Sequence, residues 1–297
     1  MGKETHDAFS CARQVFIEAD EALSFSLSDL CFHGPAEELK LTENTQPAIL
    51  TASVAILRVI QERGFRPDYV AGHSLGEYTA LVCARALPLS DAVRLVRKRG
   101  RYMQEAVPVN RGAMTAILGL EADLVREACR AVTGRGIVSP ANFNAPDQTV
   151  IAGDAEAVAR AADVAKAKGA KRTMPLPVSA PFHCDLMAPA RDRLAVDLEA
   201  QEFNDLDMPL ITNVDAAEVR SGSAARASLI RQVCLPVRWV ESIQYLVDHG
   251  VDKFVEVGPG KVLSGLVKKI APAVSTYSVD GIRGIEALAS GVSGATM

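Results

Sequence analysis

The sequence predicts a protein of the α/β class, with a parallel sheet in a large domain and a smaller domain inserted into that domain. Two observations predict this fold. A serine between two glycines, Ser74, follows a short apolar strand pattern at 68–71 and precedes a helical pattern that begins at Glu77. A strand, a sharp turn and a helix in this order are typical of a parallel sheet covered by helices. Strand and helix patterns also follow one another as β-α-β-β-α-β over residues 113–176, which predicts a separate small domain.

The composition limits the kind of protein. The 297 residues are enough to bury a full core, and 48% hydrophobic with 23% charged residues is typical of a globular protein. A net charge of −4 gives no reason to expect binding to nucleic acid or to an anionic membrane. No apolar run reaches the roughly 18 residues of a membrane span, and the first residues do not resemble a signal peptide. The six cysteines lack zinc-ligand spacing. We therefore expect reduced thiols in a cytoplasmic protein that uses no metal.

The large domain is expected at 1–108 and again at 179–297. Its first part contains, in order, helices at 8–23 and 48–63, the strand at 68–71, the helix from Glu77 and a helix at 90–107. Its second part contains a helix at 187–200, a strand at 209–214, a helix at 240–250, a strand at 253–257 and a helix at 262–270. The tail after Asp280 is rich in Gly, Ala and Ser, and we expect its last residues to fray.

The small domain is expected at 109–178. Its elements are strands at 113–118, 137–143, 148–152 and 171–176, with helices at 123–132 and 155–168. This order is the ferredoxin-like one, which can fold as a subdomain between two halves of a larger domain.

Ser74 has the setting of a nucleophile. A serine on a very sharp strand-to-helix turn needs neighbours without side chains, and Gly72 and Gly76 provide them. The helix that follows would present free N–H groups and its positive dipole end to a developing negative charge. This arrangement is typical of α/β-hydrolase-like cores. The alternative is a turn in which the serine has only a structural role.

A serine at such a turn needs a base, and His183 is the best placed of the five histidines. It follows a predicted strand within the rigid segment Ala180-Pro181-Phe182. A hydrogen-bonded loop histidine is the alternative interpretation. In hydrolases of this kind the order is serine, acid, histidine, and the histidine lies close to the C-terminus. Here a long segment with at least two predicted strands follows His183, which argues against an ordinary esterase or lipase.

Arg99 is the third candidate. On the helix at 90–107 it falls within the apolar arc, whereas Arg94, Arg97, Lys98 and Arg101 share a solvated face. A buried arginine stays charged and needs an anion. That anion is either an internal carboxylate or the carboxylate or phosphate of a substrate. The segment 256–261, by contrast, lacks phosphate-loop spacing and predicts only a tight turn between a strand and a helix.

Together these residues resemble the malonyl-CoA:acyl-carrier-protein transacylases and the acyltransferase domains of fatty-acid and polyketide synthases. The resemblance runs from Met1 to about Ile270. The motifs that carry it are Thr45-Gln46-Pro47-Ala48, Gly72-His73-Ser74-Leu75-Gly76-Glu77-Tyr78, Arg97-Lys98-Arg99-Gly100-Arg101-Tyr102-Met103-Gln104, Asn142-Phe143-Asn144-Ala145-Pro146, Ala180-Pro181-Phe182-His183 and Glu256-Val257-Gly258-Pro259-Gly260.

The resemblance implies a set of roles. Ser74 takes the malonyl group from malonyl-CoA, His183 acts as its base, and the acyl-enzyme passes malonyl to the phosphopantetheine thiol of an acyl carrier protein. The backbone carbonyl of Gln232 orients His183 in place of an acid, and the N–H of Leu75 is one oxyanion-hole donor. The resemblance further implies that malonyl's free carboxylate pairs with Arg99 and that Phe182 and Asn142 belong to the substrate site. It implies no cofactor, and we expect a monomer.

Family members begin with an apolar strand that ends in Gly-Gln-Gly-Ser-Gln, whose Gln N–H is the second oxyanion donor. The present sequence starts at Met1-Gly2-Lys3-Glu4, which resembles the segment just after that motif. We therefore expect one central strand and one donor to be missing, through a misplaced start, a truncation or gene decay. Four alternatives stay open for the function: a free-standing acyltransferase of a polyketide pathway, a thioester hydrolase, a truncated copy of low activity, and a non-catalytic module that binds CoA or the carrier protein.

Overall fold

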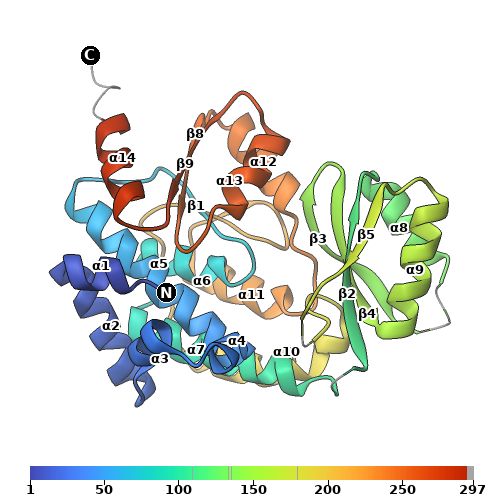
Figure 1. The fold of residues 1–297 in the computed structure, drawn as a ribbon, viewed down its shortest axis with the longest axis horizontal. Coiled ribbons are helices and arrows are strands. Elements are labelled where there is room, and N and C mark those ends of the chain that lie inside the picture. The colour runs from blue at the N-terminus through green and yellow to red at the C-terminus, as the bar shows by residue number, and fades with distance from the viewer. Residues whose placement is uncertain (109, 133, 135, 179, 293–297) are drawn as a thin grey trace.

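The structure is a computed structural model that describes residues 1–108, 110–132, 134, 136–178 and 180–292. It is a mixed α/β protein, as the sequence predicts. Figure 1 shows a larger body, which contains the N-terminus and α14 (Ile282–Val292), and a smaller one, in green and yellow, beside it. The expected boundaries at 109 and 179 and the expected frayed end at 293–297 fall on residues outside this description.

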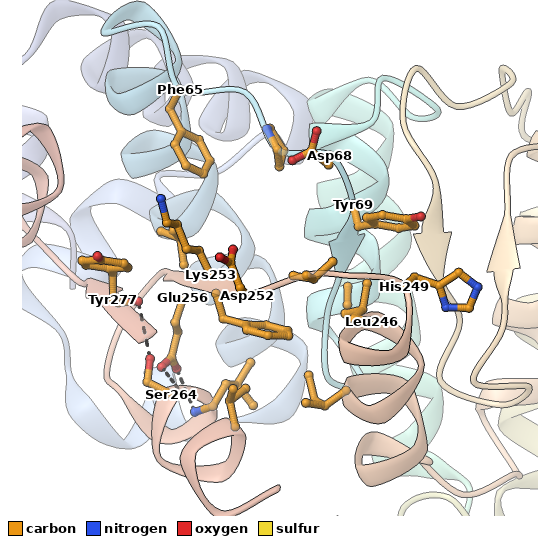
Figure 2. A pocket seen from close by; sticks show the side chains of 18 of the residues that line it. Phe65, Asp68, Tyr69, Leu246, His249, Asp252, Lys253, Glu256, Ser264 and Tyr277 are labelled. Atoms are coloured by element: carbon orange, nitrogen blue, oxygen red, sulfur yellow. Dashed lines mark hydrogen bonds between the residues drawn. The ribbon is translucent and has the colours of Figure 1, made fainter. Parts of the chain in front are cut away.

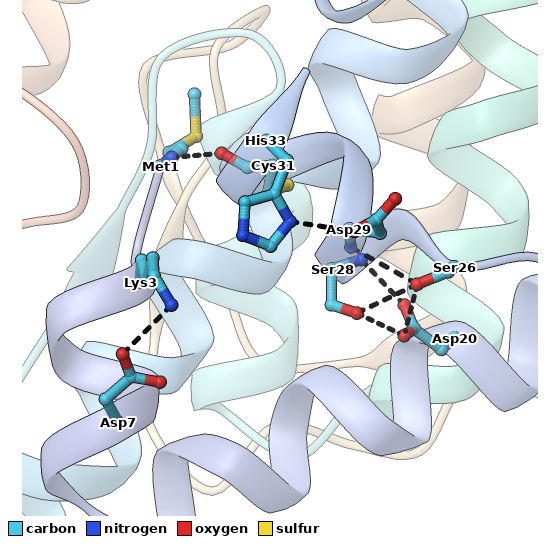
Figure 3. Close-up of polar contacts among 9 residues, drawn as sticks. All are labelled: Met1, Lys3, Asp7, Asp20, Ser26, Ser28, Asp29, Cys31 and His33. Carbon is cyan, nitrogen blue, oxygen red and sulfur yellow. Dashed lines mark hydrogen bonds and ion pairs between the residues drawn. The ribbon is translucent and has the colours of Figure 1, made fainter. Parts of the chain in front are cut away.

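Four short helices form the N-terminal layer of the larger body. They are α1 (Lys3–Ala8), α2 (Ser10–Leu23), α3 (Leu27–His33) and α4 (Ala36–Lys40). The single helix expected at 8–23 is wrong at its start, because Phe9 has an extended backbone that separates α1 from α2. Local polar contacts hold the layer together: Asp20 accepts the N–H of Ser28 at 2.9 Å, and the Met1 amino group donates to the carbonyl of Cys31 (Figure 3).

Two long helices form the centre of the larger body. These are α5 (Thr42–Glu62), which is almost entirely buried after Thr45, and α7 (Leu89–Glu105). Helix α5 begins six residues before the predicted start at 48, with Pro47 inside it. Pro47 is the sixth residue of the helix and has no N–H, so the carbonyl of Glu43 lacks its usual i+4 donor there. The two helices approach closely at Gly100, where a Cβ would lie 2.5 Å from the carbonyl oxygen of Thr42.

The strands of the larger body form two separate sheets. In the first, β1 (Val70–Ala71) pairs in parallel with β6 (Leu210–Ile211), and β7 (Glu218–Val219) pairs with β6 in antiparallel. In the second, β8 (Lys253–Val257) pairs in parallel with β9 (Ser275–Val279). The predicted strand at 253–257 is confirmed, whereas the one at 209–214 is shorter than predicted because a turn that returns to Thr212 ends it.

The remaining helices of the larger body surround these sheets. They are α6 (Gly76–Cys83), α10 (Ala188–Glu199), α11 (Gly222–Gln232), α12 (Trp239–Asp248), α13 (Val262–Ile270) and α14 (Ile282–Val292), with the short 3-10 helix η1 (Asp185–Met187) before α10. Sequence analysis missed α3, α4, β7, β9, α11 and α14. The α13 bounds agree with the predicted helix at 262–270.

The smaller body contains one antiparallel sheet in the order β3-β4-β2-β5. Its strands are β2 (Gly112–Leu118), β3 (Val138–Ala145), β4 (Gln148–Asp154) and β5 (Arg172–Pro175), and its helices are α8 (Ala122–Arg130) and α9 (Ala155–Ala167). Ile117 and Ile151 pack with Val125 and Val158 of the helices in one apolar cluster. The two bodies join where β3 exchanges backbone hydrogen bonds with Val237, each 2.9 Å long.

A cavity of about 780 Å³ lies between the two sheets of the larger body. Tyr69 and Ala71 of the β1 segment line it on one side, and Phe254 and Glu256 of β8 line it on the other (Figure 2). Both β1 and β8 are edge strands of their sheets. The two sheets lie on opposite sides of the cavity and are not hydrogen-bonded to each other. Within the described residues, no helix is both long enough and apolar enough to cross a membrane.

The close approach of α5 and α7 predicts the effect of one substitution. Gly100→Ala places its Cβ against the Thr42 carbonyl and the Glu43 backbone, which cannot move aside cheaply. We expect the free energy of unfolding to fall by about 1–3 kcal/mol, the usual cost of overpacking. Chemical denaturation measures it.

Gly265→Ala is the matched control, because a Cβ at this helical glycine of α13 meets nothing within 4 Å. We expect it to raise stability by about 0.5–1 kcal/mol through helix propensity. Equal effects of the two substitutions would contradict the packing argument.

Candidate active site

Ser74 lies at the turn between β1 and α6, with a left-handed backbone (φ 52°). Such a conformation is costly for a residue with a side chain and is characteristic of functional turns. Gly72 is required by the turn, since a Cβ there would lie 2.0 Å from the carbonyl group of Gly76. The expectation that Gly76 is required for the same reason is wrong: a Cβ at Gly76 meets nothing within 4 Å. Only one of the two glycines is therefore fixed by sterics.

His183 faces Ser74 from the segment between β5 and η1. Its Nε2 is 2.8 Å from Ser74 Oγ, and its Nδ1 is 2.8 Å from the backbone carbonyl of Gln232 at the end of α11. A carbonyl only accepts hydrogen bonds, so Nδ1 carries the proton and Nε2 is free to accept the serine hydroxyl proton. Burial, with the nearby charge of Arg99 as the second cause, lowers the pKa of His183 to about 3. The imidazole is consequently neutral near pH 7, as a general base must be.

Arg99 is 2% exposed and reaches the same serine. Its Nη2 donates to Ser74 Oγ and to Gln232 Oε1, each at 3.0 Å, and its Nη1 donates to Gln46 Oε1 at 2.7 Å. All three acceptors are neutral oxygens. Over the described ranges, no carboxylate oxygen lies within 4.0 Å of the guanidinium. The alternative of an internal ion pair therefore finds no direct partner among the described residues, and a buried positive charge lies beside Ser74 Oγ.

Sequence analysis missed three side chains that support this arrangement. Asn213 accepts the N–H of Ser74 at 2.6 Å and donates to the carbonyl of Gly72 at 2.6 Å, so it fixes both ends of the turn. Gln232 contributes its side chain as well as its carbonyl, donating to the Ser74 carbonyl at 3.0 Å. Glu77, which is fully buried, accepts from Gln232 Nε2 at 2.9 Å and from the Asn213 N–H at 3.0 Å.

One signal could have identified Glu77. It lies four residues before Leu81 and next to Tyr78, so it falls on the apolar side of its helix, as Arg99 does on its own helix. Burial raises the pKa of Glu77 to about 7, opposed by its hydrogen bonds to Gln232 and Asn213. Asn213 and the Gln232 side chain gave no such signal, because nothing in the local pattern distinguishes them from other polar residues.

The remaining predicted residues lie around this centre. Leu75 is the N-cap of α6, and its N–H precedes the first helical hydrogen bonds, which begin at Gly76. Phe182 is half-buried and packs against the apolar clusters of both bodies. Asn142 is buried in β3 beside Val237. It is Asn144, two residues later, that reaches the turn, with its Oδ1 2.8 Å from His73 Nε2.

The segment 256–261 forms a tight strand-to-helix turn. The Glu256 carboxylate accepts the N–H groups of Leu263 (3.0 Å) and Ser264 (2.7 Å). A carboxylate of the chain itself thus occupies the start of α13, where a phosphate would bind. No group of three or more His, Cys, Asp or Glu side chains in the described part of the chain is placed to hold a metal ion.

Comparison with known proteins accounts for this geometry. Residues 1–282 match the acyl transferase domain family. The chain is 50% identical over 287 residues to the malonyl CoA-acyl carrier protein transacylase of Bacillus subtilis strain 168, across 96% of this chain and 90% of that one. The chain belongs to the malonyl CoA-acyl carrier protein transacylase family. The transacylase of Escherichia coli K12 is also 50% identical, across 92% of this chain and 89% of its own.

Solved structures of transacylases share the whole fold. An acyl carrier protein S-malonyltransferase from Vibrio cholerae has a TM-score of 0.95 at 46% identity, covering 97% of this chain and 94% of its own. A malonyl-transacylase solved in complex with a type II PKS acyl-carrier protein also has a TM-score of 0.95, at 48% identity, covering 98% and 94%. The resemblance drawn from the sequence motifs to this transacylase family is confirmed.

The lowered pKa of His183 predicts an unusual pH profile. Because the imidazole is neutral at every pH above its folded-state pKa, we expect the rate at which a fluorophosphonate labels Ser74 to stay nearly constant from pH 8 to pH 5. A base with the ordinary pKa of about 6.5 would lose roughly 30-fold over the same range. Mass spectrometry of the labelled protein gives the rate. An acid limb centred near pH 6.5 would show that the pKa of His183 is not lowered.

Proposed function

We propose that the chain transfers a malonyl group from malonyl-CoA to the phosphopantetheine thiol of an acyl carrier protein, through an acyl-enzyme on Ser74. The observation that carries this proposal is the buried charge of Arg99. Its guanidinium contacts Ser74 Oγ and two amide oxygens, and it has no anion as a direct partner among the described residues. An acyl group with a free carboxylate supplies that anion at the reacting serine.

The position of Arg99 accounts for selection of malonyl over acetyl groups. A guanidinium pairs well with a carboxylate because two of its N–H groups match the two oxygens. An acetyl group would occupy the site and leave a desolvated charge without an anion, and sites built around such a charge discriminate strongly against the neutral analogue. The N–H that donates to Ser74 Oγ in the free protein becomes available to the carboxylate when the serine is acylated.

The first half-reaction loads the serine. Ser74 Oγ attacks the thioester carbonyl carbon of malonyl-CoA while His183 Nε2 takes the hydroxyl proton. The tetrahedral intermediate carries its negative charge on the former carbonyl oxygen, to which the N–H of Leu75 donates at the positive end of α6. The carbon–sulfur bond then breaks, His183 returns the proton to the CoA thiolate, and the malonyl group remains on Ser74 as an ester.

The second half-reaction reverses these steps with a different thiol. His183 takes the proton of the phosphopantetheine thiol, and the sulfur attacks the ester carbonyl. The bond to Ser74 Oγ breaks and His183 gives the proton back to the serine. These steps balance without an electron acceptor or a metal ion, so we propose that no cofactor takes part. Throughout, the Gln232 carbonyl accepts the Nδ1–H of His183 and stabilises the transient imidazolium as a dipole in place of an acid.

We also propose an architecture and a location. Residues 1–108 and 179–297 form an α/β-hydrolase-like core, and 109–178 form an inserted ferredoxin-like subdomain. The strand order β3-β4-β2-β5 supports the subdomain, and the hydrogen bond between His73 and Asn144 supports a site at the junction of the two parts. All six cysteines are free thiols, which supports a cytoplasmic location.

Arg99→Ala tests the role of the charge. We expect the variant to lose about 2–5 kcal/mol of transition-state stabilisation with malonyl-CoA, which is the usual cost of removing one partner of a buried charge pair. That corresponds to a fall in kcat/KM of roughly 30- to 5,000-fold, while the rate with acetyl-CoA changes far less. Arg101→Ala, on the exposed face of the same helix, is the matched control and should leave both rates unchanged. An unchanged preference for malonyl-CoA in Arg99→Ala would contradict the proposal that Arg99 pairs with the acyl carboxylate.

Ser74→Ala distinguishes transfer from its alternatives. With malonyl-CoA, we expect the wild-type protein to gain the mass of one malonyl group at Ser74 and the variant to gain none. Addition of the carrier protein should discharge the ester faster than water does. Loss of the ester to water at the same rate would favour a thioester hydrolase, and full transfer by Ser74→Ala would exclude both enzymatic assignments.

A further inference from the structure

We propose that Glu77 is a positioning residue that fixes the amide orientation of Gln232 and thereby holds Arg99 in place to recognise the acyl carboxylate. The inference rests on the proposed function, since the effect on Arg99 is observed through the choice of acyl group. Glu77 does not reach the reacting serine oxygen. It acts through Gln232, which lies between the two buried charged side chains.

The contacts of Glu77 come from one oxygen. Oε2 accepts the N–H of Asn213 at 3.0 Å and Gln232 Nε2 at 2.9 Å, in the first turn of α6 directly after the Ser74 turn. Glu77, Asn213 and Gln232 are all fully buried. Water therefore cannot replace either contact. Removing the acceptor leaves the Asn213 N–H unsatisfied, and it leaves Gln232 Nε2 with the Ser74 carbonyl and the longer contact to Asn213 Oδ1.

The surroundings of Gln232 leave its amide only one orientation. Its Nε2 faces three acceptors: Glu77 Oε2, the Ser74 carbonyl at 3.0 Å and Asn213 Oδ1 at 3.4 Å. Its Oε1 faces Arg99 Nη2 at 3.0 Å. A rotated amide would turn its NH₂ group toward the guanidinium and its oxygen toward acceptors. Glu77 supplies the shortest of the three acceptor contacts, so it opposes this rotation most directly.

The protonation state of Glu77 does not change the argument. Its pKa is raised by burial to about 7, so both forms are populated near neutral pH. Among the described residues Oε1 has no hydrogen-bond partner, whereas Oε2 accepts two bonds. A proton therefore binds at Oε1 and leaves Oε2 an acceptor. Glu77 therefore acts as a fixed hydrogen-bond acceptor, and this role does not require its negative charge.

Loss of this acceptor affects Arg99 more than His183. The His183 partner is the main-chain carbonyl of Gln232 at the end of α11, which does not depend on the side-chain amide. The Arg99 partner is the amide oxygen itself. A disturbed amide therefore weakens recognition of a malonyl carboxylate while the reaction of a neutral acyl group at Ser74 is largely kept.

The test compares Glu77→Met with Glu77→Gln. Methionine has similar size and no strong acceptor, and glutamine keeps an oxygen that takes the place of Oε2. We expect Glu77→Met to lower the ratio of kcat/KM for malonyl-CoA to that for acetyl-CoA by about 10- to 100-fold, the value of one hydrogen bond to a charged group. Glu77→Gln should keep the ratio within about threefold, because its acceptor remains.

Two further variants make the outcome specific. Gln232→Met should lower the ratio by a similar factor, and the double variant Glu77→Met/Gln232→Met should lower it little further, because both act on one contact. Glu256→Met is the matched control, since Glu256 also accepts two N–H groups at a helix start but lies outside this network. It should leave the ratio unchanged.

Equal losses with the two substrates in Glu77→Met would overturn the inference, and so would a Glu77→Gln variant as impaired as Glu77→Met. If Glu77→Met does not fold, Glu77→Asp is the variant to measure, because its shorter side chain moves the acceptor away from Gln232. An unchanged ratio in Glu77→Asp would also overturn the inference. A wild-type protein without preference for malonyl-CoA would instead refute the proposed function, so the two failures are distinguishable.

Discussion

The structure depends on the buried positive charge of Arg99, which contacts no negative charge among the described residues. Taking the Arg99 guanidinium out of water is costly, and its three acceptors are neutral oxygens contributed by α5, by the serine turn and by α11. Three distant segments must therefore converge on one side chain. The same convergence brings Ser74 Oγ within reach of both Arg99 and His183, so the groups that satisfy the charge also bring the serine hydroxyl to the imidazole.

Gln232 connects this charge to His183. Its main-chain carbonyl orients His183, and its side chain links Arg99, the serine turn and Glu77. Because α11 ends at this residue, the helix can present a carbonyl and a side chain to the same site. A carbonyl dipole in place of an acid also adds no negative charge beside Arg99. The site therefore retains its net positive character toward an incoming carboxylate.

Sequence reasoning was strongest where a residue conflicted with its local pattern. Ser74 between glycines and Arg99 within an apolar arc both conflict with their surroundings, and both lie at the centre of the site. Asn213 and the Gln232 side chain belong to segments without such a conflict, and only the tertiary fold brings them to the serine turn. Strands β7 and β9 were missed because their residues are half-exposed and mixed in character. The role assigned to Gly76 failed because turn sterics depend on backbone direction, which the spacing of glycines does not reveal.

The cavity between the two sheets has a consequence for the behaviour of the protein in solution. Edge strands carry N–H and C=O groups that can pair with any extended chain, and most proteins keep such edges at their margins, where they are short or charged. Here the edges of β1 and β8 face one another across the interior of the larger body. An extended apolar segment placed in this gap would have backbone hydrogen-bonding groups on both sides of it. We therefore expect self-association of concentrated samples to begin at this gap. We also expect amide hydrogen exchange to be slow in the buried helices α5 and α7 and fast in the edge strands β1 and β8.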